Sequence, residues 1–535
     1  MKRYCLCAFA LVILVGLQGC SSGDFAATRP NILYIVADDL GFMDTGPFGS
    51  EIPTPNLDEL ASAGVRLNNF HTDANCQKTR VMLMASAGSG AALEVIGNPM
   101  SGRRGNLLSR DWVILPELMR DAGYATYMAG KWDLGAGDGY TPATRGFDRS
   151  FVAVDASASH FAEKFWDDPF PYEEDGRPLG IDDLPEDFYA TEYYTDKMLE
   201  FLRSNDGEQP WFAFVPYTAP HWPLQLPDDW LDRYAGRYDE GYDVLREARF
   251  SRAMELGVIP EGARLESYKP TAEPWDSLSP EQQRRHARAQ EIYAGMVEYL
   301  DMSVGRLIDY LEESGQLDNT VIMFSSDHGG SGGESGLDEN AVDPRSVANR
   351  DNRYENFGRR DSFIDHGRGF AEAATAPFRG GKGRIYEGGL RAAAIVHYPA
   401  EIPGGGVNNT FMTIMDVLPT FLDIAGTEHP GAGPYKDGRT IRGIAGRSFW
   451  PHLKGEAPAV HSPDDTAGWS ADDGHGALIR GDYKLINDPM PGGGMGVTVW
   501  RLYNIAEDPG ETRDLAALFP RLTDELAAEW EAHWR

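Results

Sequence analysis

Two apolar segments, far apart in the sequence, most constrain what this chain can fold into. Residues 31–37 read NILYIVA, and residues 319–326 read NTVIMFSS. A continuous apolar run with β-branched residues is typical of a strand that is buried on both faces of a mostly parallel sheet. The sequence therefore predicts an α/β fold, in which a large, mostly parallel sheet is flanked by helices.

Both segments end in acidic side chains. Asp38 and Asp39 follow the first segment, and Asp327 and His328 follow the second. Open α/β sheets bind ligands at the carboxyl ends of their strands, and adjacent carboxylates repel each other unless a cation lies between them. A hard divalent ion with oxygen ligands suits such a place. Because an Asp pair at a strand end is also common in turns, the metal site depends on the two strands meeting at one sheet edge.

A cysteine stands in a segment with features of an anion site. Cys76 precedes the apolar run VMLMAS, which has helical character, and Arg80 follows four residues later. One helical turn would place both side chains on the same face. The thiol and the guanidinium would then lie near a helix N-terminus, where unpaired N–H groups and the helix dipole favour anions. A small buried thiol beside a surface arginine is the alternative.

The first residues direct the chain to a location rather than contribute to its fold. Lys2 and Arg3 precede an apolar run over residues 6–17, and Leu17-Gln18-Gly19-Cys20 resembles the lipobox of bacterial lipoproteins. This pattern predicts a signal peptide over 1–19, lipidation at Cys20, a tether over 20–30 and a place in the bacterial cell envelope. A signal peptide without lipid attachment is the alternative, and the apolar run is too short to span a membrane.

The charge of the chain excludes one class of partner. Lys and Arg number 49 against 82 Asp and Glu, which gives a formal net charge of −33. Nucleic-acid binding needs a basic surface, so we expect no nucleic-acid partner. An anionic substrate would need a locally positive pocket in so acidic a protein.

Six motifs occur in the order and approximate spacing of the type I sulfatases, and the bacterial arylsulfatases are the branch that they most resemble. The motifs are PNILYIVADDLG (30–41), the stretch from Cys76 to Arg80, AGKWDLG (129–135), APHWPLQ (219–225), SSDHGG (325–330) and GGKGRIYEGGLR (380–391). The resemblance spans nearly the whole chain after residue 30. It implies a fold like that of the alkaline phosphatase superfamily and a sulfuric ester hydrolase of the arylsulfatase class.

The resemblance also implies the parts of the site. Calcium, or magnesium in some relatives, would be held next to Cys76 by Asp38, Asp39, Asp327 and His328, and Cys76 itself counts among the metal residues. The nucleophile would be a formylglycine (3-oxoalanine) made from Cys76. Arg80, Lys131 and Lys382 would surround the nucleophile and the sulfate oxygens, because fixed cations stabilise the charge that develops there. His221 would protonate the leaving alcohol of a sulfated small molecule or glycan.

The chain departs from the family pattern at several positions, including residues 83–86 and the loop over 87–100. Lys78 stands where the signature Cys-x-Pro-x-Arg has proline, and Asp133 replaces the histidine of GKWHLG. Asp133 can act as a base, but as an anion beside a sulfate it repels the substrate unless cations offset it. His328 replaces the usual asparagine and is a competent metal ligand.

These departures leave two other functions open. The first is a phosphodiesterase or phosphonate ester hydrolase of the same superfamily. The second is a catalytically impaired lipoprotein that binds sulfated ligands, with its lipid anchor as the sole membrane contact. The sequence does not identify the natural substrate or the oligomeric state.

The rest of the chain predicts the architecture. A catalytic domain is expected over 31–450 and a small α+β domain over 451–535. Helices are expected over 115–122, 193–204, 294–314 and 413–425, strands over 211–217 and 390–398, a polar surface region over 228–290 and a long substrate-contacting loop over 329–368. In the small domain, residues 476–487 and 497–504 predict antiparallel strands that pack against a helix over 515–534.

Overall fold

The computed structural model describes residues 29–96, 108–137, 139–154, 159–163, 171–207, 209–265, 270–333, 336–337, 350–470, 475–487 and 499–534. The predicted signal peptide and the lipidation site at Cys20 lie outside these ranges. Within them, the helices are all too short or too polar to cross a membrane.

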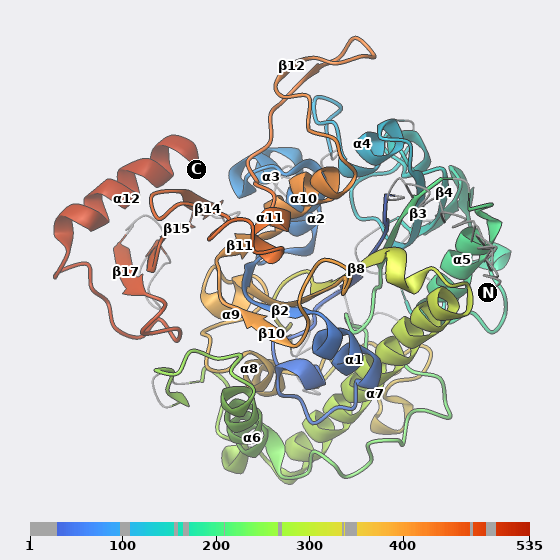
Figure 1. The fold of residues 1–535 in the computed structure, drawn as a ribbon. Helices are drawn as coiled ribbons and strands as arrows, with labels where there is room; N and C mark the ends of the chain where they lie inside the picture. The colour runs from blue at the N-terminus through green and yellow to red at the C-terminus, as the bar shows by residue number, and fades with distance from the viewer. Residues whose placement is uncertain are drawn as a thin grey trace, which may run out of the picture.

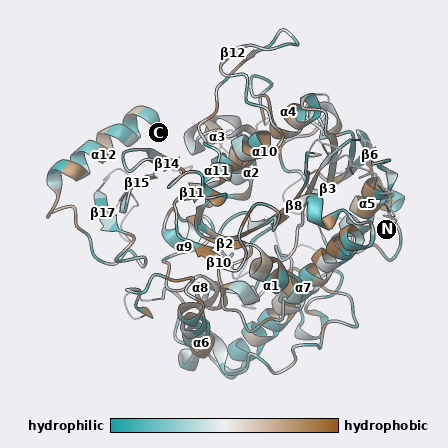
Figure 2. Cartoon of the chain, viewed as in Figure 1, coloured by the Kyte–Doolittle hydropathy of each residue, from teal (hydrophilic) through white to brown (hydrophobic). Residues whose placement is uncertain are grey.

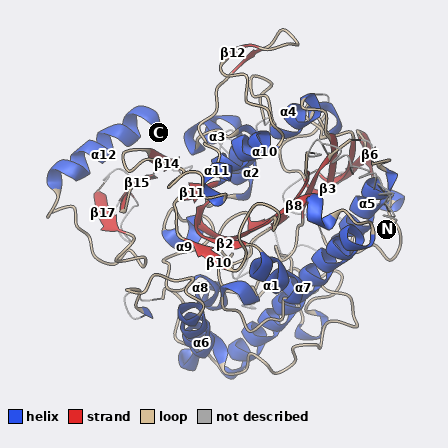
Figure 3. Ribbon diagram, viewed as in Figure 1, coloured by secondary structure: helices blue, strands red, loops and turns tan. Residues whose placement is uncertain are grey.

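One large sheet forms the centre of the molecule (Figures 1 and 3), and it has eleven strands within the described residues. The strand order is β10-β2-β9-β8-β1-β7-β3-β4-β5-β6, with β11 also paired to β2. The bounds are β1 (Asn31–Ala37), β2 (Val65–His71), β3 (Ala125–Lys131), β4 (Arg149–Ala153), β5 (Tyr172–Glu174), β6 (Arg177–Leu179), β7 (Trp211–Pro216), β8 (Thr320–Ser326), β9 (Arg391–His397), β10 (Gly406–Asn408) and β11 (Met412–Thr413).

The centre of this sheet is parallel. Strands β8, β1, β7, β3 and β4 run in the same direction, whereas β9 is antiparallel to both β8 and β2. Every residue of β1 and β8 is buried, which explains why their sequences do not alternate between apolar and polar residues. In Figure 2 the strands near β2 are coloured as hydrophobic, whereas the outlying helix α12 (Pro520–His533) is largely hydrophilic.

Helices cover both faces of the sheet because successive β1 side chains point to opposite sides. Leu33 and Ile35 pack into one core, and Ile32 and Tyr34 pack into the other. The first core receives α1 (Pro55–Ala63), α5 (Ala190–Ser204), α6 (Gly241–Glu255), α7 (Pro280–Glu313) and α8 (Arg368–Thr375). The second receives α2 (Cys76–Ala85), α3 (Ser89–Ile96), α4 (Leu115–Asp121), α10 (Val417–Ile424) and α11 (Trp450–Leu453).

Two predictions about the middle of the chain were wrong. Helix α7 begins at Pro280 rather than near residue 294, and Ser279 caps its first turn. The region 228–290 is not simply a polar surface, because Arg249 and Arg285 are both buried. Arg249 pairs with Asp44 at 2.6 Å. Arg285 donates hydrogen bonds to the backbone carbonyls of Gly336, Leu337 and Asn352. Arginine can be buried here because its donors find fixed acceptors.

The other predicted elements differ from the structure by a few residues. Helix α5 begins at Ala190 rather than at residue 193. The helix predicted over 413–425 begins with a 3₁₀ turn, Ile414–Asp416, before α10. The described part of the predicted loop is irregular apart from the 3₁₀ turn Tyr354–Asn356, and it ends where α8 begins at Arg368.

The C-terminal part of the chain forms a smaller sheet at one side of the molecule (Figure 1). Its four antiparallel strands are β14 (Thr466–Ser470), β15 (Gly476–Arg480), β16 (Tyr483–Asn487) and β17 (Trp500–Asn504). The sequence did not predict β14, and α12 begins at residue 520 rather than at 515. Leu526 and Trp530 of α12 pack on one face of this sheet, whereas Trp469 and Ile486 on the other face join the core that covers the large sheet.

The predicted fold class is confirmed: a large mixed sheet lies between layers of helices, and a small antiparallel sheet follows. The predicted boundary between residues 450 and 451 stays a prediction, and in the structure helix α11 crosses it. A short hairpin of β12 (Gly433–Pro434) and β13 (Thr440–Ile441) projects from the helical layer near α4 (Figure 1).

Candidate active site

The carboxyl ends of four neighbouring parallel strands bring together residues from distant parts of the sequence. Strands β8, β1, β7 and β3 lie side by side, and Ala37 pairs with Ser326, so that Asp38 and Asp327 leave the sheet together. The segment after β7 carries His221, and β3 ends at Lys131. This edge therefore holds the metal residues and most of the catalytic residues that the sequence predicts.

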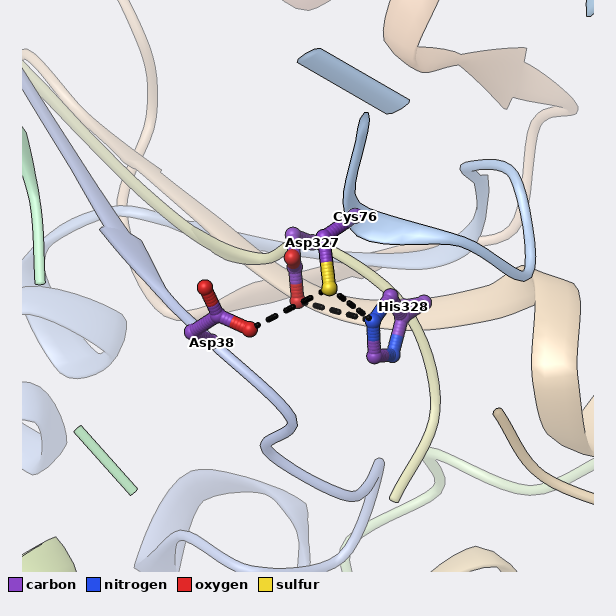
Figure 4. Close-up of side chains that lie close together, drawn as sticks. All are labelled: Asp38, Cys76, Asp327 and His328. Atoms are coloured by element: carbon purple, nitrogen blue, oxygen red, sulfur yellow. Dashed lines mark hydrogen bonds and ion pairs between the residues drawn. The ribbon is translucent and has the colours of Figure 1, made fainter. Parts of the chain in front are cut away.

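Cys76 is the first residue of helix α2 and faces this edge. The side chain of Asn75 caps the helix by accepting hydrogen bonds from the backbone N–H groups of Gln77 and Lys78, at 3.0 and 3.3 Å. The sulfur of Cys76 lies 3.1 Å from His328 Nε2 and 3.5 Å from Asp38 Oδ1 (Figure 4). It therefore points into a polar cluster rather than into apolar packing, although Cys76 is 94% buried (6% exposed).

Buried cations hold the carboxylates of this cluster. Asp38 Oδ2 accepts hydrogen bonds from Lys131 Nζ at 2.6 Å and from Arg80 at 3.0 Å. Asp39 Oδ1 accepts one from Lys382 Nζ at 2.5 Å. Arg80 lies one helical turn after Cys76, as the spacing predicts, and also donates to the carbonyl of Lys131. The structure thus brings the predicted cations and acids together.

These charges shift one another's pKa values. Burial alone would raise the pKa of Asp38, but the charges of Lys131, Arg80 and Lys382 hold it well below its ordinary value. Burial, joined by the charge of Asp38, raises the pKa of Asp327. Burial alone would lower the pKa of Lys382. The charge of Asp39 more than offsets this effect and raises the pKa of the ammonium group well above its ordinary value. Lys382 therefore stays protonated at neutral pH.

The cluster fits a cation. Among the described residues, Asp39 Oδ2 and Asp327 Oδ2 are buried oxygens that accept no hydrogen bond. Buried carboxylate oxygens without a donor are costly unless a cation coordinates them. Ligand atoms of Asp38, Cys76, Asp327 and His328 lie within 4.8 Å of one another, and a second such group contains Asp38, Asp39, Cys76 and His221. A divalent ion here would satisfy both oxygens.

His221 is held in one orientation. Its Nδ1 faces the carbonyl of Trp222, and because a carbonyl can only accept, Nδ1 carries the proton. Nε2 then accepts from Lys382 Nζ at 3.1 Å. Burial lowers the pKa of His221 to about 3, although Asp39 opposes this shift. The imidazole ring of His221 is therefore neutral at ordinary pH. The proton between His221 Nε2 and Lys382 Nζ is bonded to the ammonium group of Lys382.

One residue that positions His221, His160, was not predicted from the sequence. His160 is buried, and its Nε2 lies 3.0 Å from the carbonyl oxygen of His221. The backbone N–H of His160 in turn donates to Gln225 at 3.0 Å. A single histidine in SASHFAE has no spacing relative to the other motifs that would have predicted this contact.

Two of the departures from the family pattern lie in different surroundings. Asp133 lies beside Lys131, with its Oδ2 at 3.9 Å from Lys131 Nζ, and its Oδ1 accepts a hydrogen bond from Gln77 Nε2 at 2.8 Å. Lys78 points away from the site. Its Nζ donates to the carbonyl of Ser470 in β14 at 2.6 Å and pairs with Asp73 at 3.0 Å. Asp133 thus belongs to the cluster, whereas Lys78 connects α2 to the small sheet.

Comparisons with known proteins agree with this geometry. A family model described as Sulfatase matches residues 30–427. The chain is 40% identical over 527 residues to an uncharacterized sulfatase of Schizosaccharomyces pombe, which covers 94% of this chain and 93% of that protein. It is 34% identical over 448 residues to an arylsulfatase of Klebsiella aerogenes, with 80% and 92% covered. One solved structure, in complex with its substrate D-glucosamine-2-N,6-O-disulfate, matches at a TM-score of 0.61 and 22% identity over 94% of this chain and 97% of that one.

Proposed function

Because this chain belongs to the sulfatase family and is a sulfuric ester hydrolase, we propose that its reaction takes place at Cys76, after conversion of this residue to formylglycine. One observation carries the proposal: Cys76 begins α2 with its sulfur 3.1 Å from His328 Nε2 and 3.5 Å from Asp38 Oδ1. The encoded sulfur thus lies where the ends of β1 and β8 meet, next to the residues that fit a cation.

The proposed cofactors have defined places in the chain. Asp38, Asp39, Asp327 and His328 would hold a calcium or magnesium ion, and the two carboxylate oxygens that accept no hydrogen bond support this assignment. When present, the formylglycine supplies a hydrated aldehyde oxygen as nucleophile, and the divalent ion lowers the pKa of that oxygen.

The cations of the chain itself bind and orient the sulfate group. Lys131, Arg80 and Lys382 already make contacts of 2.5–3.0 Å with Asp38 and Asp39 in this cluster. Because Lys131 and Arg80 are buried, Lys382 is mostly buried and all three are fixed by ion pairs, they stabilise developing negative charge more strongly than they would in water. They also make a positive pocket within a chain of net charge −33.

The pair of His221 and Lys382 holds the proton for the leaving oxygen. Lys382 Nζ donates to His221 Nε2, so the proton for the leaving oxygen would come from this hydrogen-bonded pair. His160 fixes the backbone of His221 and thereby keeps the imidazole in place. On the other side of the site, Asp133 is the base, and Lys131 beside it reduces its repulsion of an anion.

The substrate and location remain parts of the proposal. A sulfated small molecule or glycan fits the positive pocket, and the relative whose structure contains D-glucosamine-2-N,6-O-disulfate as its substrate supports a sulfated sugar. The lipobox-like segment at Cys20 supports export to the bacterial cell envelope with a lipid anchor.

Peptide mass analysis of the protein from its native host, combined with an esterase panel, tests this proposal. We expect the peptide that contains Cys76 to carry an aldehyde in place of the thiol, sulfate esters to be hydrolysed faster than phosphate esters, and Cys76→Ala to abolish hydrolysis. A preference for phosphate diesters or phosphonate esters would replace the proposal with the related hydrolase activity. An unmodified thiol without turnover, but with binding of sulfated ligands, would replace it with the impaired binding protein.

A further inference from the structure

We propose that the thiol form, as the sequence encodes it, binds a divalent transition-metal ion of the zinc class through Cys76, His328, Asp38 and Asp327. This goes beyond the proposed function, because it concerns protein in which Cys76 has not been converted and does not require turnover of a sulfate ester. On binding, the S–H bond of Cys76 breaks, the proton leaves to solvent, and a sulfur–metal bond forms without any oxidation or reduction.

The donor atoms decide the class of ion. Calcium and magnesium are bound almost entirely by oxygen ligands. Zinc and its neighbours are bound by thiolate sulfur, imidazole nitrogen and carboxylate oxygen, and four such ligands complete a tetrahedral site. Cys76 contributes sulfur and His328 contributes nitrogen, so half of this four-residue group suits the transition metals.

The distances are close to the edges of such a tetrahedron, although the separation of Cys76 Sγ from His328 Nε2 is shorter. Bonds of 2.0–2.3 Å at tetrahedral angles give ligand–ligand separations of about 3.3–3.8 Å. The sulfur of Cys76 lies 3.1 Å from His328 Nε2 and 3.5 Å from Asp38 Oδ1, and His328 Nε2 lies 3.6 Å from Asp327 Oδ1. Figure 4 shows these side chains converging from β1, α2 and the end of β8. Small side-chain movements would therefore suffice to bind the ion.

The contacts around the four ligands leave the required atoms available. His328 Nδ1 donates to the carbonyl of Gly329 at 2.8 Å, so Nε2 presents its lone pair to the sulfur of Cys76. Such a hydrogen bond from the other ring nitrogen is typical of metal-binding histidines. Lys131 and Arg80 hold Asp38 by Oδ2 and leave Oδ1 facing the sulfur. Asp327 Oδ1 accepts one hydrogen bond, from the backbone N–H of Asp39 at 3.1 Å, and keeps a second lone pair for an ion.

The second group of potential ligands is less suitable. It shares Asp38 and Cys76 with the first group but uses Asp39 and His221. The Nε2 atom of His221 already accepts from Lys382, and Lys382 also holds Asp39 at 2.5 Å. An ion bound there would lie next to the ammonium group of Lys382. It would also take Asp39 and His221, which are the hydrogen-bond acceptors of that group. His328 is therefore the histidine ligand that we assign.

Cobalt(II) provides a spectroscopic test on purified protein whose thiol at Cys76 has been verified by mass. We expect one Co²⁺ per chain, a thiolate-to-cobalt charge-transfer band in the near ultraviolet, and loss of that band when zinc is added. Cys76→Ser should eliminate the charge-transfer band, and His328→Asn should weaken cobalt binding by at least about tenfold. His533→Asn, which changes an exposed histidine of α12, should leave both unchanged.

Several results would overturn the assignment. These are failure of folded thiol-form protein to bind cobalt or zinc, an unchanged band in Cys76→Ser, and calcium that displaces cobalt at equal concentration. Far-ultraviolet circular dichroism of each variant separates loss of a ligand from loss of the fold. Converted protein has no sulfur at position 76 and should lack the band while it releases sulfate, so failure of this inference and failure of the proposed function give different results.

Discussion

At the scale of single residues, one departure from the sulfatase pattern, Asp133, contacts Gln77, which stands at a variable position of the signature Cys-x-Pro-x-Arg. Asp133 occupies the place of a histidine, and Gln77 donates a hydrogen bond to it at 2.8 Å. Lys131 lies on the other side of the same carboxylate. An acid that is both oriented and flanked by a cation can replace a neutral base next to an anionic substrate, because the cation offsets part of the repulsion.

Asp133→Asn tests the role of this carboxylate. We expect kcat to fall about a hundredfold, as is typical for loss of a general base. KM should fall as well, because the amide no longer repels the sulfate. Steady-state kinetics on an aryl sulfate measures both constants, and Asp309→Asn on the exposed side of α7 is the matched control. An unchanged kcat would mean that Asp133 takes no part in the reaction.

Gln77→Ala tests the hydrogen bond itself. Without its donor, the carboxylate of Asp133 is free to turn toward Lys131, so we expect kcat to fall about tenfold with little change in KM. Gln77→Asn, whose amide is one methylene shorter, should restore only part of the activity. Equal activity of all three proteins would show that Lys131 alone positions Asp133.

The sequence could predict much of the site at this scale. Asp38 and Asp327 were predictable because a buried strand that ends in an acid is a local pattern, and two such strands must end at one edge of a parallel sheet. The hydrogen bond between Gln77 and Asp133 joins residues 56 positions apart. His160 acts through a backbone carbonyl. Neither contact has a local signature, because both depend on how loops fold over the sheet edge.

At the scale of secondary-structure elements, helix α2 is fixed from the side opposite to the site. Lys78 pairs with Asp73 and donates to the carbonyl of Ser470 in β14, and both charged side chains are at least 95% buried. Ser89 donates to the other oxygen of Asp73 at 2.6 Å, and Trp469 Nε1 donates to the carbonyl of Thr72 at 2.7 Å. The small sheet therefore holds the turn that leads into Cys76.

Lys78→Met should destabilise the protein by about 3–5 kcal/mol, because it leaves the carboxylate of Asp73 buried without its cation. The double variant Lys78→Met/Asp73→Asn should lose less stability than the single variant, because the uncompensated charge is gone. Denaturant unfolding measures the free energies. Lys454→Met is the control, since its pair with Glu456 is partly exposed to solvent and contributes about 0–1 kcal/mol. A single variant as stable as the control would contradict the role of this ion pair.

The accuracy of the predicted elements follows the strength of their local patterns. Strands β1 and β8 were predicted to within one residue, because each is a continuous apolar run with β-branched residues. The first turns of α7 were missed because Arg285 and Gln290 look like surface residues. They are buried through hydrogen bonds to a distant segment and to His366. Strand β14, TAGWS, is short and is defined by its pairing with β15 rather than by its own residues.

At the scale of the whole molecule, a buried charge cluster joins the large sheet to the small one. Glu387 accepts hydrogen bonds from His71 at 3.0 Å and from Lys484 in β16 at 2.8 Å, and Lys484 also pairs with Glu511 at 2.9 Å. Burial raises the pKa of Glu511 to about 7. The charge of Glu387 adds to this rise, and the charge of Lys484 offsets only part of it. Lys484 and His71 hold the pKa of Glu387 well below its ordinary value, although burial alone would raise it.

The raised pKa of Glu511 predicts how stability depends on pH. Its folded-state pKa lies above its ordinary value of 4.5, so this group favours the folded state below about pH 4.5, and the advantage disappears as the pH rises through about 7. We expect the unfolding free energy of the unchanged protein, relative to Glu511→Gln, to decrease from pH 5 to pH 8. Urea unfolding at several pH values measures the difference.

The lowered pKa of Glu387 contributes to the unfolding free energy with the opposite dependence on pH. This contribution is present in both the unchanged protein and Glu511→Gln, so it largely cancels when the two are compared. Glutamine at position 511 retains an oxygen that can accept from the backbone N–H of Glu387, as Glu511 does at 2.7 Å. Glu456→Gln, at an exposed position, should show no such pH dependence. A difference between the unchanged protein and Glu511→Gln that stays constant from pH 5 to pH 8 would show that Glu511 is ionised throughout.

The hydrogen bond from Lys78 to Ser470 also imposes an order of events during synthesis. Its two partners are separated by 392 positions. A ribosome that adds about 5–20 residues per second needs about 20–80 s to travel from one to the other. Throughout that interval the nascent turn around Cys76 lacks its hydrogen bond to the small sheet. The conversion of Cys76 that we propose would have this time in which to take place, before the chain folds over the sulfur.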